Sequence, residues 1–350
     1  MSAKPFPILF IAPTRIGDAV LTSGLIPRLL AEIPNARFTI VASPVSAPLF
    51  AQTPQLERLI VMEKEKGGAH WFKLWGQVRG RQWGLVLDRR GSGLSQFLRA
   101  RRRAVFRRTG GEPVHKVIES ARLLHLQDDP PAPAIYTSEK IEAKAAALLG
   151  QGGPLLAIGP AANWIGKTWP DDRFAMTAVQ LMGDGGPFAD GRLLILGGPE
   201  DWRAAETLRR VMPRERSIDL TGKADLPTAF ACLKRARMFI GNDSGLMHLA
   251  ASAGIPTLGV FGPSDERLYG PWGEAAKVVR GPRTFAQIRA IDPNLNQPVC
   301  HMLDLSADKV QAAARQLFDE TAHAPAPPAQ PAASAAPKKR VRRPRKDPDA

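Results

Sequence analysis

The chain has 350 residues, of which 44% are hydrophobic and 23% charged, as expected for a globular protein with room for two domains. Its formal net charge is +15 and it has only two cysteines, which excludes a disulfide framework and C-x-x-C metal sites and favours a reducing compartment. No apolar run approaches the roughly 20 residues of a membrane helix, and no signal-peptide pattern opens the sequence. We therefore predict a cytoplasmic protein that does not span a membrane.

Short apolar segments alternate with helical patterns along the chain. The strand predictions are continuous Val/Ile/Leu runs, at 8–12, 38–42, 57–61, 84–88, 155–159, 193–197, 238–241, 257–261 and 276–280. The helix predictions are at 18–32, 70–80, 93–103, 116–126, 138–149, 171–183, 199–211, 226–236 and 244–253. Strands without polar alternation are typical of parallel sheets covered on both faces. Because the series restarts near 150–155, we predict two doubly wound α/β domains, residues 1–150 and 151–321.

The composition changes after about residue 322 to Pro and Ala, followed by a basic cluster at 338–346. We predict a disordered tail over 322–350. Its last thirteen residues hold seven Lys/Arg and two Asp, which leaves about +10 on the rest of the chain and favours an anionic partner. The cluster could bind anionic lipid headgroups at the inner-membrane surface or simply solvate the tail. A nucleic-acid role is less favoured, because no aromatic or Gly residues interleave its charges.

The first predicted strand ends in an unusually polar segment, "PTRIGDAVLTSG". Thr14, Gly17 and Asp18 follow the strand, and Asp18 falls in the first turn of the next helix. Such a carboxylate can simply stabilise the helix dipole. It can also act as a general base, because ligands of parallel sheets bind beyond the carboxyl ends of the strands. Gly17 would let a substrate approach the backbone.

A second polar strand end is "GNDSGLMH" at 241–248. Ser244 begins a helix whose unpaired backbone N–H groups form an anion site, which suits a pyrophosphate. Gly245 permits close approach, and His248 shares a helix face with Ser244. Asp243 directly precedes this helix. The alternative is a capped helix with His248 packed in the core.

Two further strand ends carry single charged candidates. In "NWIGKTWP", Lys167 is placed to bind a phosphate as a compact point charge. In "LGGPED", Glu200 could accept hydrogen bonds from ribose hydroxyls, or be an ordinary acid in the first turn of a helix. Between 89 and 108 there are eight arginines and no acid, so Arg99, Arg101, Arg102 and Arg103 are candidates for an anionic acceptor or a lipid surface.

Taken together, "RIGDAVLTSGLIPRL", "GKTWP", "LGGPED" and "GNDSGLMHLAASAGIPTLGVFGPSD" resemble glycosyltransferase family 9, the ADP-heptose:lipopolysaccharide heptosyltransferases and their relatives. The resemblance extends over roughly 8–320. It implies a GT-B fold, in which two Rossmann-like domains face a cleft. The acceptor would bind the first domain and the sugar nucleotide the second. The final helix, near 306–320, would pack against the first domain.

The resemblance also assigns roles to the candidate residues. Asp18 matches the proposed catalytic base and Lys167 the phosphate-binding lysine. The nucleotide-diphosphate motif matches Asp243, Ser244, Gly245 and His248, while Glu200 matches the ribose-binding acid. The family typically inverts the anomeric centre and needs no metal, which agrees with the absence of a D-x-D pair at a strand end.

We therefore predict an inverting, metal-independent glycosyltransferase that needs no cofactor. It would move a sugar, heptose from ADP-heptose, to a lipopolysaccharide-core or related phosphorylated glycolipid acceptor, with no nucleic-acid partner. The segment "NWIGKTWP" matches mainly at Lys167, so the sequence does not identify the donor. Two alternatives stay open: a sugar-nucleotide epimerase or hydrolase on the same architecture, and a non-catalytic basic binding protein.

Overall fold

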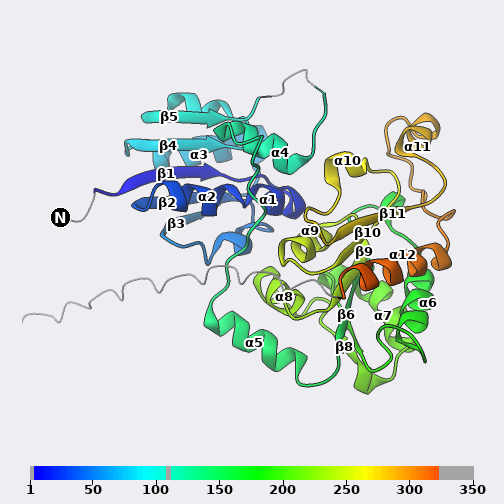
Figure 1. Cartoon of the computed structure of the whole chain (residues 1–350). Helices are drawn as coiled ribbons and strands as arrows, with labels where there is room; N and C mark the ends of the chain where they lie inside the picture. Colours follow the sequence, from blue (N-terminus) through cyan, green and yellow to red (C-terminus); the bar gives the residue numbers. More distant parts are fainter. Residues whose placement is uncertain (1–3, 108–111, 323–350) are drawn as a thin grey trace, which may run out of the picture.

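Two parallel β-sheets, one in each half of the chain, organise the computed structural model, which describes residues 4–107 and 112–322 (Figure 1). The first sheet has the order β3-β2-β1-β4-β5, with bounds β1 Phe6–Ile11, β2 Ala36–Ala42, β3 Leu56–Val61, β4 Trp83–Asp88 and β5 Ala100–Val105. The second has the order β11-β10-β9-β6-β7-β8, with bounds β6 Leu155–Gly159, β7 Arg192–Ile195, β8 Ser217–Asp219, β9 Met238–Asn242, β10 Thr257–Phe261 and β11 Ala276–Arg280. All strand pairs are parallel, as predicted.

Helices cover both faces of the sheets and connect the strands (Figure 1). They are α1 Ile16–Thr22, α2 Leu25–Glu32, α3 Ala69–Val78, α4 Lys116–Ala121, α5 Glu139–Leu149, α6 Asp171–Met182, α7 Trp202–Arg210, α8 Leu226–Leu233, α9 Gly245–Ser252, α10 Glu266–Tyr269, α11 Phe285–Ile291 and α12 Ala307–Glu320. Alternate residues of β1 enter different core clusters, Phe10 on one face and Leu9 on the other. Among the described residues, no helix has both the length and the apolar character to cross a bilayer.

The predicted helix at 18–32 is two helices, because the chain breaks at Ser23 and Gly24. Ser23 Oγ donates to Val20 O and accepts from Ala134 N. A Cβ at Gly24 would lie 2.4 Å from the carbonyl oxygen of Ala132. The segment that leads to the second half therefore crosses directly over this break, where only glycine fits.

The helix predicted at 93–103 is wrong over most of its length. A single 3-10 turn, η3 Gly93–Phe97, is followed by the edge strand β5. Pairing with β4 satisfies the backbone of β5, and the exposed arginines tolerate an edge position because their charged ends remain in water. The short strand β8 was not predicted either, since its sequence "SID" lacks an apolar run.

The final predicted helix is present as α12, but it packs on the second half. Its buried residues Val310, Ala314 and Leu317 join the core around β10 and α6. This differs from the expectation that it packs against the first domain, because its apolar face is already filled by the second sheet. Helix α5, which precedes the predicted boundary at 150/151, packs against α8 of the second half. The tail predicted for 322–350 lies outside the described residues apart from residue 322.

Candidate functional site

Helices α1 and α9 begin at the carboxyl edges of the two sheets and pack against each other between the two halves (Figure 1). A Cβ at Gly17 would lie 2.9 Å from His248 Cδ2, and a Cβ at Gly245 would lie 2.6 Å from Ile16 Cγ2. Each helix therefore carries a glycine where the other approaches. The sequence candidates Gly17, Gly245 and His248 are brought together, whereas Thr14 lies exposed just before α1.

Asp18 lies in the first turn of α1 and is partly buried. Burial raises the pKa of its carboxyl, while the nearby cations Arg15, Arg89 and Lys116 oppose that rise. A carboxylate with a raised pKa is a stronger base than a solvated one. This is the direction that proton abstraction needs, and it is opposite to the lowered pKa expected of a carboxylate that only stabilises a helix dipole.

A charged network surrounds Asp18. Glu119 on α4 accepts from Arg89 Nη2 at 3.2 Å and from Lys116 Nζ at 2.7 Å. The Arg89 side chain is 7% exposed, and its Nε and Nη1 have no hydrogen-bond partner within the part of the chain that the structure describes. Buried donors of this kind are normally satisfied. The Arg89 guanidinium carbon lies 4.5 Å from the centre of the Phe106 ring, so this ring covers part of the guanidinium.

Asp243 is the centre of a polar cluster in the second half. Its Oδ2 accepts from Lys167 Nζ at 3.1 Å and from Ser264 Oγ at 2.6 Å. Its Oδ1 lies 3.9 Å from His248 Nε2. Lys167 lies in the 3-10 turn Ile165–Lys167 that follows β6, and its ammonium is paired with the carboxylate that precedes α9 rather than free.

His248 is buried at the contact between the halves. Its Nδ1 has no hydrogen-bond partner among the described residues. Burial lowers the pKa of the imidazole to about 4, which outweighs the opposing effect of Asp243. His248 is therefore neutral at pH 7, and its role is a hydrogen-bonding or packing one rather than that of a cation.

Two polar residues of the "GNDSG" segment serve the fold. Asn242 Oδ1 accepts from Trp169 N at 3.0 Å, and its Nδ2 donates to Pro160 O at 2.7 Å. This side chain ties β9 to the loop that carries Lys167. Ser244 Oγ accepts from Met247 N at 3.4 Å and caps α9. The cap leaves the first N–H groups of the helix and the Ser244 hydroxyl hydrogen free to meet an anion.

A buried contact between His301 and Asp292 lies behind the loop that carries Lys167. His301 Nε2 and Asp292 Oδ2 are 3.2 Å apart, and both side chains are almost fully buried. The backbone N of His301 donates to Gly166 O at 3.0 Å, one residue before Lys167. The segment 292–301 therefore helps to hold the loop that carries Lys167 in place.

The remaining candidates lie farther out. Glu200 is exposed in a 3-10 turn, Pro199–Asp201, after β7. Arg99, Arg101 and Arg102 are exposed on or beside β5, two strands from β1. The Arg103 guanidinium donates to Ser95 O and Leu98 O. The structure does not bring these five residues against Asp18 or Asp243.

Sequence reasoning missed Tyr269 and His115. Burial raises the pKa of the Tyr269 hydroxyl, and the negative charges of Asp18, Glu119 and Asp243 raise it further. Carboxylates of both halves of the chain therefore act on this hydroxyl. His115 Nε2 is 2.9 Å from Gly270 O, which links α4 to the segment after α10. Neither residue belongs to a motif, and only the packing of the two halves places them at the site.

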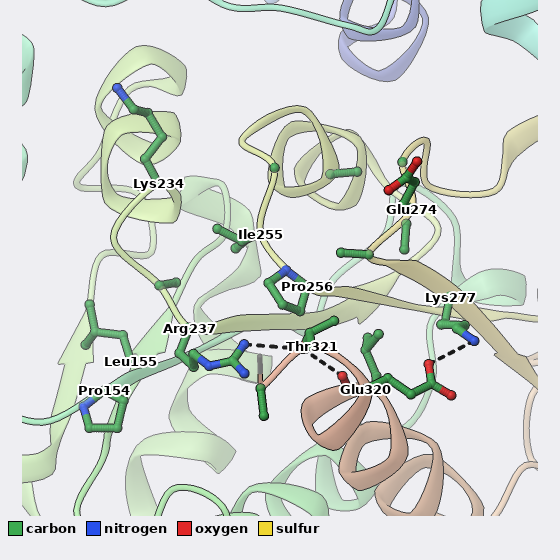
Figure 2. A pocket seen from close by; sticks show the side chains of 18 of the residues that line it. Pro154, Leu155, Lys234, Arg237, Ile255, Pro256, Glu274, Lys277, Glu320 and Thr321 are labelled. Carbon is green, nitrogen blue, oxygen red and sulfur yellow. Dashed lines mark hydrogen bonds and ion pairs between the residues drawn. The ribbon is translucent and has the colours of Figure 1, made fainter. Parts of the chain in front are cut away.

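A cavity of about 1030 Å³ lies at the opposite edge of the second sheet (Figure 2). It is lined by residues at the amino ends of the strands, including Leu155, Pro256 and Lys277. Figure 2 shows that Lys277 pairs with Glu320 and Arg237 with Thr321. None of the predicted site residues lines this cavity. Within residues 4–107 and 112–322, no group of three His, Cys, Asp or Glu is arranged to hold a metal ion.

Comparisons with known proteins all identify heptosyltransferases as similar to this chain. Residues 112–296 match the family described as glycosyltransferase family 9 (heptosyltransferase). A lipooligosaccharide heptosyltransferase 2 of Haemophilus influenzae is 26% identical over 312 residues, covering 78% of this chain and 88% of the relative. A lipopolysaccharide heptosyltransferase 2 of Salmonella typhimurium is 23% identical over 324 residues, covering 81% of this chain and 91% of the relative.

Solved structures confirm the fold class. A glycosyl transferase family 9 protein of Veillonella parvula superposes with a TM-score of 0.74 at 21% identity, covering 91% of this chain and 99% of that one. The E. coli ADP-heptose lps heptosyltransferase II superposes with a TM-score of 0.72 at 21% identity, covering 91% of this chain and 100% of that one. The two sheets thus form the predicted GT-B arrangement of two Rossmann-like domains.

Proposed function

The chain belongs to glycosyltransferase family 9 and is a glycosyltransferase, and from this premise we propose that it transfers heptose from ADP-heptose to a lipopolysaccharide-core or related phosphorylated glycolipid acceptor. The relatives named above are heptosyltransferases of lipopolysaccharide and lipooligosaccharide, which supports the substrate class. The observation that carries the proposal is the packing of α1, with Asp18, against α9, whose N-terminus can bind an anion.

Asp18 is the proposed general base. It would take the proton of an acceptor hydroxyl while that oxygen forms a bond to the anomeric carbon of the donor. The bond from that carbon to the diphosphate oxygen breaks on the opposite side, so the anomeric centre inverts. The raised pKa of Asp18 supports this role, because a poorly solvated carboxylate gains more from accepting a proton.

The departing nucleotide diphosphate would be held without a metal. Lys167 and the first N–H groups of α9 are fixed donors at the carboxyl edge of the second sheet. Asp243 would act as a positioning residue, since it holds Lys167 and Ser264 in place. Glu200, exposed at the same edge, is proposed to accept from the ribose hydroxyls.

The acceptor's anionic groups would bind the first domain. A cavity of about 430 Å³ is lined by Arg103, Arg107 and Arg122 together with Glu119. Glu119 also belongs to the charged network around Asp18, which couples this cavity electrostatically to the proposed base. Arg99, Arg101 and Arg102 lie on the outer side of the same edge and would extend the positive potential toward the glycolipid. The protein is proposed to be cytoplasmic and to contact the inner membrane peripherally, and the 338–346 cluster would contribute from outside the described residues.

The test is a transfer assay without added metal. Purified protein is incubated with ADP-heptose and a heptose-acceptor core glycolipid, and ADP release and product mass are followed. ADP release that requires the acceptor supports the transferase. ADP-heptose consumption without acceptor would support the epimerase or hydrolase alternative instead. Repeating the assay with GDP- and UDP-sugars tests the donor.

A further inference from the structure

An exposed aromatic surface lies on the first domain, away from the candidate site. Helix α3 buries Leu74 and Val78 against the first sheet, while Phe72 is 77% exposed on its outer side. Trp75 lies on the same side one turn later and is 36% exposed. Single exposed apolar side chains are common on protein surfaces, but several that gather on one side of a domain mark an interaction site.

Phe97 in η3 extends this surface, with 76% of its area exposed. Leu94 and Leu98 beside it enter the same core cluster as Leu74 and Val78 of α3. Helix α3 and η3 therefore pack on the same face of the first sheet, and all three aromatic side chains are exposed on the outer side of that layer. We call Phe72, Trp75 and Phe97 the aromatic face.

The surroundings of the aromatic face are strongly basic. Residues 61–107 hold twelve Lys/Arg against three Asp/Glu, which accounts for nine of the fifteen net positive charges of the chain. Some of these cations are paired, as in Lys73 with Glu65 and Arg81 with Glu57. Others are exposed and form no ion pair within the described residues, namely Lys64, Lys66, Arg79, Arg99, Arg101 and Arg102.

We propose that the aromatic face docks this domain on an anionic phospholipid bilayer. Aromatic rings on the outer side of an amphipathic helix, flanked by Lys and Arg, fit the headgroup region, where the rings enter the apolar boundary and the cations meet lipid phosphates. The Arg79 guanidinium lies 4.6 Å from the centre of the Trp75 ring, so a cation and a ring are already placed side by side. The excess of Lys and Arg around the rings favours a broad anionic surface as the partner.

Helix α3, which carries Phe72 and Trp75, is connected through Trp71 to the segment that precedes Asp18. Trp71 on α3 lies under the Arg90 guanidinium, with 5.8 Å between the ring centre and the guanidinium carbon. Arg90 Nε donates to Ala12 O, which lies between β1 and α1, the helix that carries Asp18. A bilayer bound here would hold the acceptor-binding domain at the membrane. The inference rests on the proposed function only where it concerns the acceptor, because binding to a bilayer does not require turnover.

The experiment is sedimentation of the full chain with vesicles of phosphatidylcholine mixed with equal phosphatidylglycerol, and with vesicles of phosphatidylcholine alone. We expect binding to the anionic vesicles that weakens with salt, and a loss on the order of tenfold for the double variant Phe72→Ser, Phe97→Ser. The matched control is Trp202→Ser, which removes an exposed aromatic side chain from α7 of the second domain and should bind like wild type.

Three outcomes would overturn the proposal, and two others separate it from the proposed function. Unchanged vesicle binding by the double variant, with its circular dichroism intact, would show that the aromatic face does not insert. Tighter binding to a single-stranded RNA oligonucleotide than to anionic vesicles, lost in the double variant, would assign the surface to RNA. A dimer that the double variant dissociates would assign it to a second copy of the chain. If the double variant loses vesicle binding but releases ADP normally with a soluble core fragment as acceptor, docking is supported and the proposed function stays intact. If the wild-type protein binds vesicles but transfers no sugar, only the proposed function is refuted.

Discussion

Gly17 on α1 faces the imidazole of His248 on α9 so closely that a methyl group has no room, because a Cβ there would lie 2.9 Å from His248 Cδ2. The contact joins the two domains at the place where the proposed base and the proposed diphosphate site meet. It is therefore the first contact to perturb.

Gly17→Ala should separate stability from activity. Within a helix, Ala is favoured over Gly by about 1 kcal/mol, so the helix itself gains. The added methyl must displace His248 or part the domains, and a displacement of about 1 Å can cost on the order of a hundredfold in rate. We expect kcat/KM to fall by that order, with only a small change in melting temperature, because the helix gain offsets part of the overpacking cost of about 1–3 kcal/mol.

Gly76→Ala is the matched control, since Gly76 is also helical but a Cβ there meets nothing within 4 Å. It should gain similar helix stability and keep full activity. Normal transfer by Gly17→Ala would show that the domain contact is not the arrangement used in turnover.

Asp18→Asn distinguishes the two interpretations of this carboxylate. A general base contributes about 10²–10⁴ in rate, so transfer should fall by that range while calorimetry still detects ADP binding. The folded-state pKa of Asp18 is raised, so its protonated form is favoured and the charged form at pH 7 costs folding free energy. The neutral amide should therefore be as stable as wild type or more stable at pH 7.

A first-turn acid that only serves the helix dipole predicts the reverse. Its replacement would lower stability by about 0.3–1 kcal/mol and leave turnover nearly unchanged. Thermal unfolding at pH 7 and at pH 5 separates the two cases: the advantage of Asp18→Asn over wild type should shrink as the pH falls toward the raised pKa.

The sequence was sufficient to predict the fold because the strands are continuous apolar runs. Leu9 and Phe10 are both buried, on opposite faces of the first sheet, so no polar alternation could appear. The predicted helix 93–103 extended into strand β5 because consecutive arginines, Arg101 to Arg103, are equally compatible with a helix. Only pairing with β4 decides in favour of a strand.

The site could be predicted only where a strand end and a motif coincide. Asp18, Lys167 and Asp243 meet that condition. Tyr269 and the Glu119–Arg89 pair do not, because they reach the site through packing between segments far apart in the chain. Asn242 belongs to the same motif as Asp243 but serves the fold, because its side chain bonds Trp169 N and Pro160 O.

Lys167→Ala should weaken ADP binding. Hydrogen bonds to charged groups contribute about 1.5–3 kcal/mol, which corresponds to roughly ten- to hundredfold in Kd. The variant also leaves Asp243 buried with only Ser264 as a strong donor, so stability should fall by about 1–3 kcal/mol. Calorimetry with ADP and urea unfolding measure both effects.

Lys223→Ala is the control for Lys167→Ala, because Lys223 pairs with Asp219 at an exposed position of the same domain. It should bind ADP normally and unfold within about 0.5 kcal/mol of wild type. An unchanged ADP affinity in Lys167→Ala would remove this lysine from the diphosphate site.

The burial of His248 should make stability depend on pH in acid. Its pKa is about 4 in the folded state against 6.5 as the ordinary value, so the unfolded chain binds more protons between these values and the folded state loses stability as the pH falls through that window. The loss attributable to this group is of the order of 3 kcal/mol. In His248→Gln, unfolding free energies measured between pH 7 and pH 4 should vary less steeply than in wild type by that amount.

His125→Asn is the control, at an exposed position with φ 60° that Asn tolerates, and it should keep the wild-type slope. An identical slope in wild type and His248→Gln would mean that the imidazole is open to water, and the tight contact with Gly17 would then not persist in solution.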